Sequence, residues 1–227
     1  MPTELTRRDT HGDPAEEFDR QVATYASLGV PALHGMSAAA FVDLVRPLRE
    51  VAHTRPPGGP AVPPGSTTEP GDPGRLPFVL VVPGVPAEDL MPLTRQGTHA
   101  GYVDMRPVDS SVFGPLPESA VPGTPYLAWD VDTGRATLNL HPADAGAWLA
   151  TRERLPLTID EGIAALLLNP GLLRAANCYQ MLASRDGSKR IPSLWVTSTG
   201  RPRLGWCYER MPHTWLGAAS CAARITA

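Results

Sequence analysis

A stretch rich in proline and glycine limits most strongly how this chain can fold. Residues 55–77 contain eight prolines and five glycines in 23 positions and show no apolar periodicity. Proline lacks the backbone N–H that helices and sheets need, and glycine loses much entropy when it is ordered, so this stretch is unsuited to the interior of either element. We therefore predict an N-terminal helical appendage at residues 1–54, a linker or exposed loop at residues 55–77, and a main domain at residues 78–227.

Two amphipathic helices are predicted in the appendage. The first covers residues 14–28, where Asp13 is placed to accept from the first free N–H groups and Gly29 is placed to end the helix. The second begins at Ser37, and Pro47 must kink or split it because proline removes a helical hydrogen bond. Such short helices need a surface to cover their apolar faces, so they must pack on the rest of the chain or on another chain.

Two further helices are predicted in the main domain. A capping box from Thr158 to Glu161 begins an apolar helix, which ends at Asn169. In this motif the threonine hydroxyl and the glutamate carboxylate satisfy each other's backbone donors. Residues 142–154 are the second candidate.

Strand-like segments fill most of the remaining main domain. Residues 126–129 are predicted to enter a hairpin that turns at 132–134 and leaves through 137–138, and residues 214–224 form either a final helix or an irregular strand. The other predicted strands are residues 78–82, 102–105, 178–183, 193–197 and 204–208. Because no regular βαβ alternation is present, we predict an α+β fold with a mixed or antiparallel sheet, packed helices and a C-terminal β-meander.

The composition excludes several protein classes. The longest apolar run, residues 163–168, is far shorter than the ~20 residues that cross a bilayer. The first residues are polar and lack the apolar core of a signal peptide, and three cysteines without a CxxC pair do not form a disulfide framework. We therefore predict a cytoplasmic protein without a membrane contact, and the sequence leaves its oligomeric state open.

Two aspartates near the predicted hairpin raise the question of a metal site. Asp130 and Asp132 would face the same way in a strand and could offer two carboxylates to a metal ion. Alternatively, Asp132 bonds its own backbone near Gly134, as aspartate does in turns. The turn chemistry favours the second interpretation.

The cysteines and one histidine suggest either buried thiols or a catalytic pair. Cys178, Cys207, His213 and Cys221 are separated by 28, five and seven residues, so none of them forms the short-spaced pair typical of zinc sites. We expect no metal and no cofactor. Cys221 as a nucleophile with His213 as its base would give a hydrolase or acyl-transfer enzyme, and Cys178 with His213 is a weaker version of the same hypothesis.

Charge is distributed unevenly along the chain. Residues 1–168 carry a net charge of −9 and residues 169–227 a net charge of +6. The basic part contains aromatic residues, and guanidinium groups and rings together hold anionic ligands. Alternatively, the basic residues form a solvated turn surface or pair with the acidic N-terminal part. The predicted ligand-binding residues are Arg185, Lys189, Arg190, Trp206, His213 and Trp215.

Residues 169–224 resemble an uncharacterised actinobacterial family that is known only as a domain of unknown function. The likeness rests on NPGLLRAANCYQMLASRDGSKRIPSLWV and on PRLGWCYERMPHTWLGAASCAAR. The N-terminal half and the proline-rich stretch add nothing to it. The resemblance implies a cytoplasmic protein from a GC-rich bacterium and implies no activity, cofactor or catalytic residue.

The leading functional hypothesis is therefore a binding protein for a small anionic ligand or partner, which uses the basic, aromatic C-terminal part. A Cys/His enzyme and a protein–protein interaction module are the alternatives. We expect neither nucleic acid nor a membrane among its partners.

Overall fold

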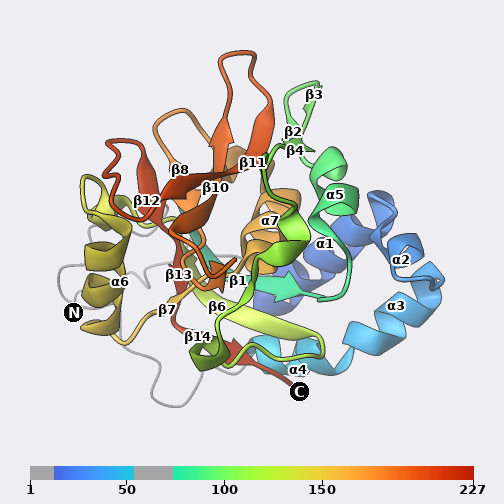
Figure 1. Ribbon diagram of the computed structural model, residues 1–227. Helices are drawn as coiled ribbons and strands as arrows, with labels where there is room; N and C mark the ends of the chain where they lie inside the picture. The colour runs from blue at the N-terminus through green and yellow to red at the C-terminus, as the bar shows by residue number, and fades with distance from the viewer. Residues whose placement is uncertain (1–12, 54–73) are drawn as a thin grey trace, which may run out of the picture.

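Helix α7 (Ile159–Leu168) contacts both of the large sheets and forms the centre of the core (Figure 1). The structure, a computed structural model, describes residues 13–53 and 74–227. The first sheet consists of β1 (Arg75–Val81), β6 (Tyr126–Asp132), β13 (Ser220–Cys221) and β7 (Leu155–Pro156) in this order, and β14 (Ala223–Ile225) also pairs with β6. The second sheet has the order β12 (Leu216–Ala218), β8 (Cys178–Gln180), β10 (Arg190–Val196), β11 (Pro202–Tyr208) and β4 (Tyr102–Val103). Helices packed on antiparallel and mixed sheets confirm the α+β class.

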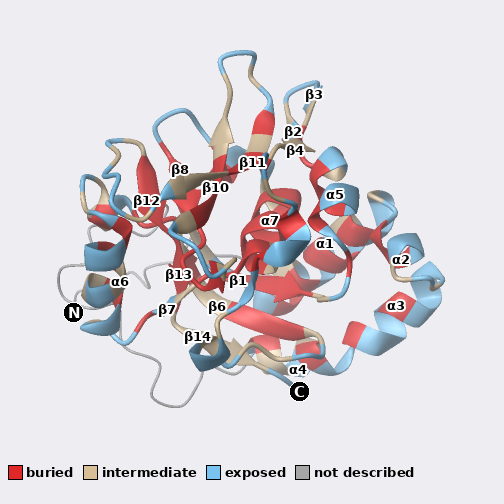
Figure 2. Ribbon diagram, viewed as in Figure 1, coloured by how far each residue is buried: buried red, intermediate tan, exposed pale blue. Residues whose placement is uncertain are grey.

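Every residue of α7 except the half-buried Asp160 is buried, as its apolar sequence predicts (Figure 2). The predicted capping box is present, with Thr158 Oγ1 accepting from Glu161 N–H and the Glu161 carboxylate accepting from Thr158 N–H. Gly162 allows the second sheet to approach closely, because a Cβ there would lie 2.9 Å from Met181 Cγ. Tyr179 of β8 donates to the Gly162 carbonyl at 2.8 Å.

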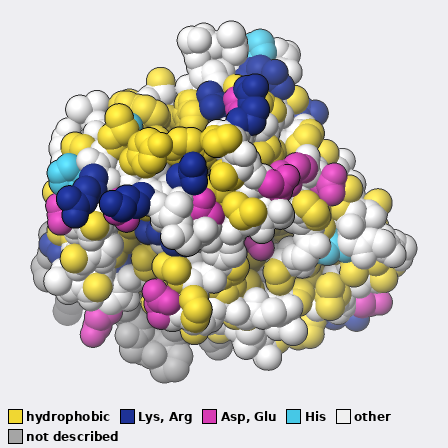
Figure 3. Space-filling model, viewed as in Figure 1, with side chains coloured by type: hydrophobic (Ala, Val, Ile, Leu, Met, Phe, Trp, Pro, Cys, Tyr) yellow, Lys and Arg dark blue, Asp and Glu magenta, His cyan; other side chains and the backbone are white. Residues whose placement is uncertain are grey.

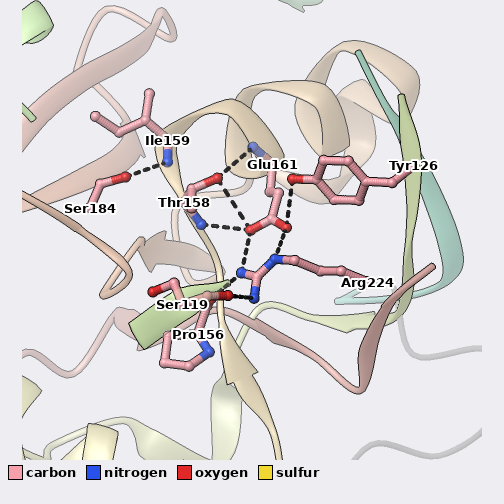
Figure 4. A network of polar contacts seen from close by, with 8 residues as sticks. All are labelled: Ser119, Tyr126, Pro156, Thr158, Ile159, Glu161, Ser184 and Arg224. Atoms are coloured by element: carbon pink, nitrogen blue, oxygen red, sulfur yellow. Dashed lines mark hydrogen bonds and ion pairs between the residues drawn. The ribbon is translucent and has the colours of Figure 1, made fainter. Parts of the chain in front are cut away.

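A buried ion pair connects α7 to the end of the chain (Figure 4). Arg224 Nε and Nη2 donate to the two Glu161 oxygens at 2.6 and 2.9 Å, and the two side chains are 3% and 0% exposed. Tyr126 OH donates to the same carboxylate at 2.9 Å. Arg224 also donates to the carbonyls of Ser119 and Pro156. Both charges are thus fully hydrogen-bonded, as buried charges must be.

The N-terminal helices are α1 (Pro14–Ser27), α2 (Val30–Leu33), α3 (Ala38–Val45) and α4 (Pro47–His53). The predicted cap at Asp13 and the predicted break before Pro47 are both confirmed. Phe18, Phe41 and Leu48 belong to the same buried cluster as Phe78 and Ile163. The helices therefore pack on the rest of the chain, and the division of the chain into domains stays a prediction.

Side chains of α1 satisfy the free backbone groups of the edge strand β1. Gln21 Nε2 donates to the Phe78 carbonyl at 3.0 Å, and Gln21 Oε1 accepts from Leu80 N–H at 2.7 Å. Tyr25 OH donates to the Leu80 carbonyl at 2.7 Å. Unpaired sheet edges attract other chains, so α1 protects this edge.

The predicted hairpin after residue 129 is wrong. β6 is followed by the 3-10 helix η4 (Arg135–Thr137) and by α6 (Pro142–Ala150), and β6 pairs instead with β1, β13 and β14. The turn itself forms, because Asp132 Oδ1 accepts from Gly134 N–H at 2.7 Å. Thr137 Oγ1 then accepts from Ala218 N–H at 2.7 Å, which directs the chain to β12 rather than back along β6.

The C-terminal predictions are largely confirmed. β8, β10 and β11 are antiparallel neighbours, and residues 216–225 form irregular short strands rather than a helix.

The predicted linker is shorter than residues 55–77, because β1 begins at Arg75. Residues 54–73 lie outside the described residues. The remaining elements are α5 (Ala87–Leu90), η1 (Met91–Leu93), β2 (Arg95–Gln96), β3 (His99–Ala100), η2 (Ser110–Val112), β5 (Gly114–Pro115), η3 (Pro117–Ser119), β9 (Ser184–Arg185) and η5 (Pro170–Leu172). Among the described helices, none has the length and apolar character needed to cross a bilayer.

Asp160 is expected to reduce stability at neutral pH. It lines a narrow apolar crevice with Tyr25 and Val85, and burial raises the pKa of its carboxyl group. Because its pKa is raised on folding, the carboxyl group of Asp160 binds a proton more tightly in the folded than in the unfolded protein. The neutral acid therefore favours folding at pH values below its ordinary pKa of 3.8. This contribution is lost as the pH rises through the folded-state pKa and the carboxyl group becomes charged. Asp160→Asn should therefore raise the Tm near neutral pH and leave it unchanged in acid, measured by thermal unfolding at both pH values. An equal shift at both pH values would contradict this explanation.

Candidate functional site

The structure does not bring the predicted nucleophiles to a base. Cys221 is fully buried, and burial raises the pKa of its thiol to about 12. Burial also raises the pKa of Cys178 to about 11, and its Sγ donates to the Arg174 carbonyl. His213 Nε2 has no hydrogen-bond partner among the described residues, and its ring packs edge-on against Trp215. This geometry gives the Cys/His enzyme hypothesis no support.

The buried thiols lead to a simple chemical test. In the folded protein Cys178 and Cys221 should not react with Ellman's reagent at mildly alkaline pH, because the reactive species is the thiolate and both pKa values are raised. After unfolding in guanidinium chloride they should react, and the absorbance of the released thiolate measures both stages. Rapid reaction of Cys221 in the folded protein would restore the nucleophile hypothesis.

The predicted basic turn is largely satisfied within itself. Asp186 Oδ1 accepts from Ser188 N–H and Oγ, and Arg190 Nη1 donates to Asp186 Oδ2 at 3.3 Å. Arg185 donates to the carbonyl of the preceding residue, and burial lowers its pKa. Lys189 is exposed. Arg190 is therefore paired within the turn, Arg185 is bonded to its own backbone neighbour, and Lys189 is exposed beside them.

Trp206 connects this turn to a different part of the chain. The Arg190 guanidinium lies 5.0 Å from the centre of the Trp206 ring. Trp206 Nε1 donates to the Met105 carbonyl at 2.9 Å and to the Arg106 carbonyl at 3.2 Å. The predicted residue Trp206 thus lies beside a segment that follows β4.

Two more arginines stack on aromatic rings of the second sheet. Arg203 lies 4.8 Å from the ring centre of Trp195, its partner across the β10–β11 pair. A Cβ at Gly205 would lie 2.3 Å from Trp195, so glycine at this position gives the indole room on the sheet. Arg201 lies 4.5 Å from the ring centre of Tyr102. Stacked guanidinium groups keep their in-plane donors available to carboxylates and phosphates.

His213 and Trp215 lie toward the other edge of this sheet. Trp215 directly precedes β12, and its ring meets Trp195 with 6.4 Å between ring centres. Figure 3 shows hydrophobic side chains gathered over the second sheet, with basic side chains at the margins of this patch. Trp215 therefore shares a face of the sheet with Trp195 and Arg203, whereas Trp206 lies on the opposite face, and Arg185 and Lys189 lie outside the stacks.

A pocket of about 360 Å³ opens at the β4 edge of the second sheet. It is lined by Glu88 of α5 and by residues 102–106 and 108–110, so it lies between β4, α5 and η2. Binding pockets for small molecules usually measure about 300–1,000 Å³. The pocket therefore has the size of a small-ligand site, and Tyr102 and Arg106 join it to the arginine–aromatic stacks.

An ion pair in the pocket lining joins Arg106 to Asp104. Arg106 donates to both Asp104 oxygens at 2.8 and 3.0 Å, and Arg203 Nη2 lies 3.2 Å from Asp104 Oδ2. The hydrogen bond from Arg106 lowers the pKa of Asp104, so this carboxylate stays ionised. Two guanidinium groups thus share one carboxylate, and a third, that of Arg201, stacks on the lining residue Tyr102.

Glu88 and Asp109 form the acidic wall of the pocket. Glu88 Oε1 accepts from Ser110 Oγ at 2.5 Å, and Asp109 Oδ1 accepts from Ser111 N–H at 2.9 Å. The bonds to Ser111 lower the pKa of Asp109. In Figure 3 acidic side chains lie over α5, below the basic side chains near the top of the face.

Sequence reasoning found one half of this site and missed the other. Trp206 and the basic character of the C-terminal part were expected, but Arg201 and Arg203 were not among the predicted ligand-binding residues, and residues 102–110 were considered only as a strand and a connection. The short spacing of Tyr102, Asp104 and Arg106 was a usable signal, because alternate residues of a strand point to one face. No local signal relates this segment to β11, about a hundred residues later.

The two aspartates considered as metal ligands have other partners. Asp130 pairs with Arg154 at 2.8 Å and with Arg75 at 2.5 Å, and Asp132 accepts from the turn at Gly134. Within residues 13–53 and 74–227, no group of three or more His, Cys, Asp or Glu side chains is arranged to hold a metal ion.

Comparison with known proteins identifies a family and no characterised relative. Neither the curated proteins nor the solved structures contain a match to this chain. A family model, described as a family of unknown function (DUF5701), matches residues 24–227. The resemblance predicted for residues 169–224 is thereby confirmed, and the expectation that the N-terminal half adds nothing to it is wrong. Since the match covers most of the chain, the protein belongs to this family of unknown function, DUF5701.

Proposed function

We propose that this protein binds a small ligand bearing a carboxylate or phosphate group in the pocket at the β4 edge of the second sheet. One observation carries the proposal: a pocket of about 360 Å³ is lined by Arg106, which shares the carboxylate of Asp104 with Arg203, and by Tyr102, on which Arg201 stacks. Guanidinium groups bind carboxylate and phosphate through paired hydrogen bonds. The three unpaired thiols support the cytoplasmic location that we also propose.

Arg201 is the most informative arginine to remove. Its Nε donates to the Ala100 carbonyl, its guanidinium stacks on Tyr102, and the described residues offer it no carboxylate. With succinate or inorganic phosphate as the probe, we expect the Tm of the natural protein to rise with probe concentration. Arg201→Ala should weaken binding about ten-fold, the scale of a lost hydrogen bond between charged groups.

Arg152 supplies a matched control. Its guanidinium lies 3.7 Å from the ring centre of Trp148 on α6, so it makes the same kind of stack away from the second sheet. Arg152→Ala should leave probe binding unchanged, as measured by isothermal titration calorimetry at low salt. Equal effects of the two substitutions, or no response of the natural protein to either probe, would overturn the proposal.

A protein contact beside Trp206 is the second candidate function. Tyr208 and Met211 are 49% and 51% exposed, and they form an apolar patch with the half-buried Trp206, which the Tyr208 ring meets edge-on. Exposed apolar patches often mark protein contacts. Met211→Ser should leave succinate binding unchanged if the pocket and this patch act separately.

A further inference from the structure

We propose that the outer face of the second sheet binds a proline-rich segment of another protein in the polyproline II conformation. The surface concerned consists of four half-buried side chains, Arg203, Trp195, Trp215 and His213, which we call the aromatic row. The Arg203 guanidinium lies 4.8 Å from the ring centre of Trp195. The ring centres of the two tryptophans are 6.4 Å apart, and those of Trp215 and His213 are 5.1 Å apart. Each member thus contacts the next, and the row is one continuous surface.

The aromatic row lies on the face of the sheet that points away from α7. Side chains alternate along β10 and β11, so Trp195 points away from Leu194 and Leu204, which are fully buried in the core. Helix α6 covers one end of this outer face, where its Leu149 belongs to the same buried cluster as Ile191 of β10. The row lies four residues further along β10 and stays half-buried.

The polar groups of the aromatic row are mainly unused donors. The indole N–H groups of Trp195 and Trp215 donate to no described residue, and neither indole nitrogen is buried. Arg203 Nε and His213 Nε2 are buried nitrogen atoms without a hydrogen-bond partner among the described residues. Native proteins leave few such atoms unpaired. Indole and guanidinium groups can only donate, so an occupant that matches the row supplies acceptors together with apolar surface.

A proline-rich segment has this complementary chemistry. Proline has no backbone N–H that would need an acceptor, and the polyproline II helix makes no internal hydrogen bonds, so its carbonyls are free to accept. Such segments bind to aromatic side chains with little loss of conformational entropy. The ring planes of Trp195 and Trp215 are 69° apart. A flat base or sugar would therefore stack on only one of the two rings, whereas a helix with three residues per turn presents side chains to both.

Decaproline with blocked ends is the probe that tests this proposal, with calorimetry and tryptophan fluorescence as the measurements. We expect it to bind and a blocked glycine–serine peptide of equal length not to bind. Trp195→Phe and Trp215→Phe each keep a ring and remove the N–H donor. Each should therefore weaken decaproline binding about two- to ten-fold, the range for one lost hydrogen bond.

Trp148→Phe is the matched control. Trp148 also stacks with an arginine, since the Arg152 guanidinium lies 3.7 Å from its ring centre, but it belongs to α6 and not to the aromatic row. This substitution should leave the affinity for decaproline unchanged. An effect as large as that of Trp195→Phe would show that the peptide binds elsewhere, and the proposal would be wrong.

The remaining outcomes separate the proposed occupant from the alternatives. If decaproline binds no better than the glycine–serine peptide, the row does not recognise polyproline II. If a synthetic peptide with the sequence of residues 55–73 binds more tightly than decaproline, the row fits the chain's own proline-rich stretch, and the choice of a partner protein is wrong. Displacement of decaproline by succinate would place both ligands at the pocket beside β4 and overturn the separate surface. Decaproline is expected to bind whether or not succinate does, because the aromatic row does not depend on that pocket.

Discussion

Arg224→Met is expected to lower the free energy of unfolding by about 3–5 kcal/mol, the usual cost of removing one partner from a buried ion pair. The loss is large because Glu161, whose side chain is 0% exposed, would keep a buried charge without its cation. Tyr126 and Thr158 would still donate to this carboxylate but would not neutralise it. Urea unfolding, followed by tryptophan fluorescence, measures the change.

Two further variants show whether the buried geometry is responsible. Arg224→Lys keeps the charge and loses the paired hydrogen bonds, so its loss of stability should be smaller than that of Arg224→Met. Arg46→Ala removes an exposed pair with Asp43 and should change stability by about 0–1 kcal/mol. Equal losses for Arg46→Ala and Arg224→Met would contradict a specific role for the buried pair.

Deletion of residues 1–53 is expected to abolish cooperative folding. The deletion removes Phe18, Tyr25 and Phe41 from the common core, and each buried aromatic residue contributes about 1.5–3 kcal/mol. It also removes the groups that satisfy the edge of β1. Together these losses approach the about 5–15 kcal/mol that stabilises a typical domain. Size-exclusion chromatography and thermal unfolding should show aggregation and no cooperative transition.

The substitution Gln21→Leu isolates the edge contribution in the full-length chain. It keeps the size of the side chain similar but replaces its amide by an apolar group, which leaves the Phe78 carbonyl and the Leu80 N–H without their partner. We expect a loss of about 1–3 kcal/mol for each buried group left unpaired. If the chain without residues 1–53 were monomeric and unfolded cooperatively, the expectation for the deletion would be wrong, and residues 54–227 would fold without the N-terminal helices.

Features set by neighbouring residues could be predicted from the sequence. The Asp13 cap, the break before Pro47 and the Thr158–Glu161 capping box each depend on hydrogen bonds within one helical turn. The strands β8, β10 and β11 are likewise joined in chain order. Local geometry therefore explains why these elements were found.

Features set by distant residues could not be predicted in this way. Glu161 was recognised as a capping residue, but nothing near Arg224 indicates that it binds the same carboxylate from 63 positions away. The hairpin after β6 failed for the same reason, since β13 and β14 occupy that edge. The acidic wall of the pocket was missed because Glu88 reaches it from a separate helix.

The position of β13 and β14 has a consequence for the order of folding. β13 lies between β6 and β7, so β7 joins the first sheet only when residues 220–221 are in place, and β14 pairs with β6 two residues later. Arg224 comes into place with the same strands and neutralises a carboxylate of the central helix. Contacts between residues far apart in the chain form slowly, because the entropy cost of closing a long loop precedes the stabilisation that the contacts give. We therefore expect completion of the first sheet to be a late step in the folding of this chain.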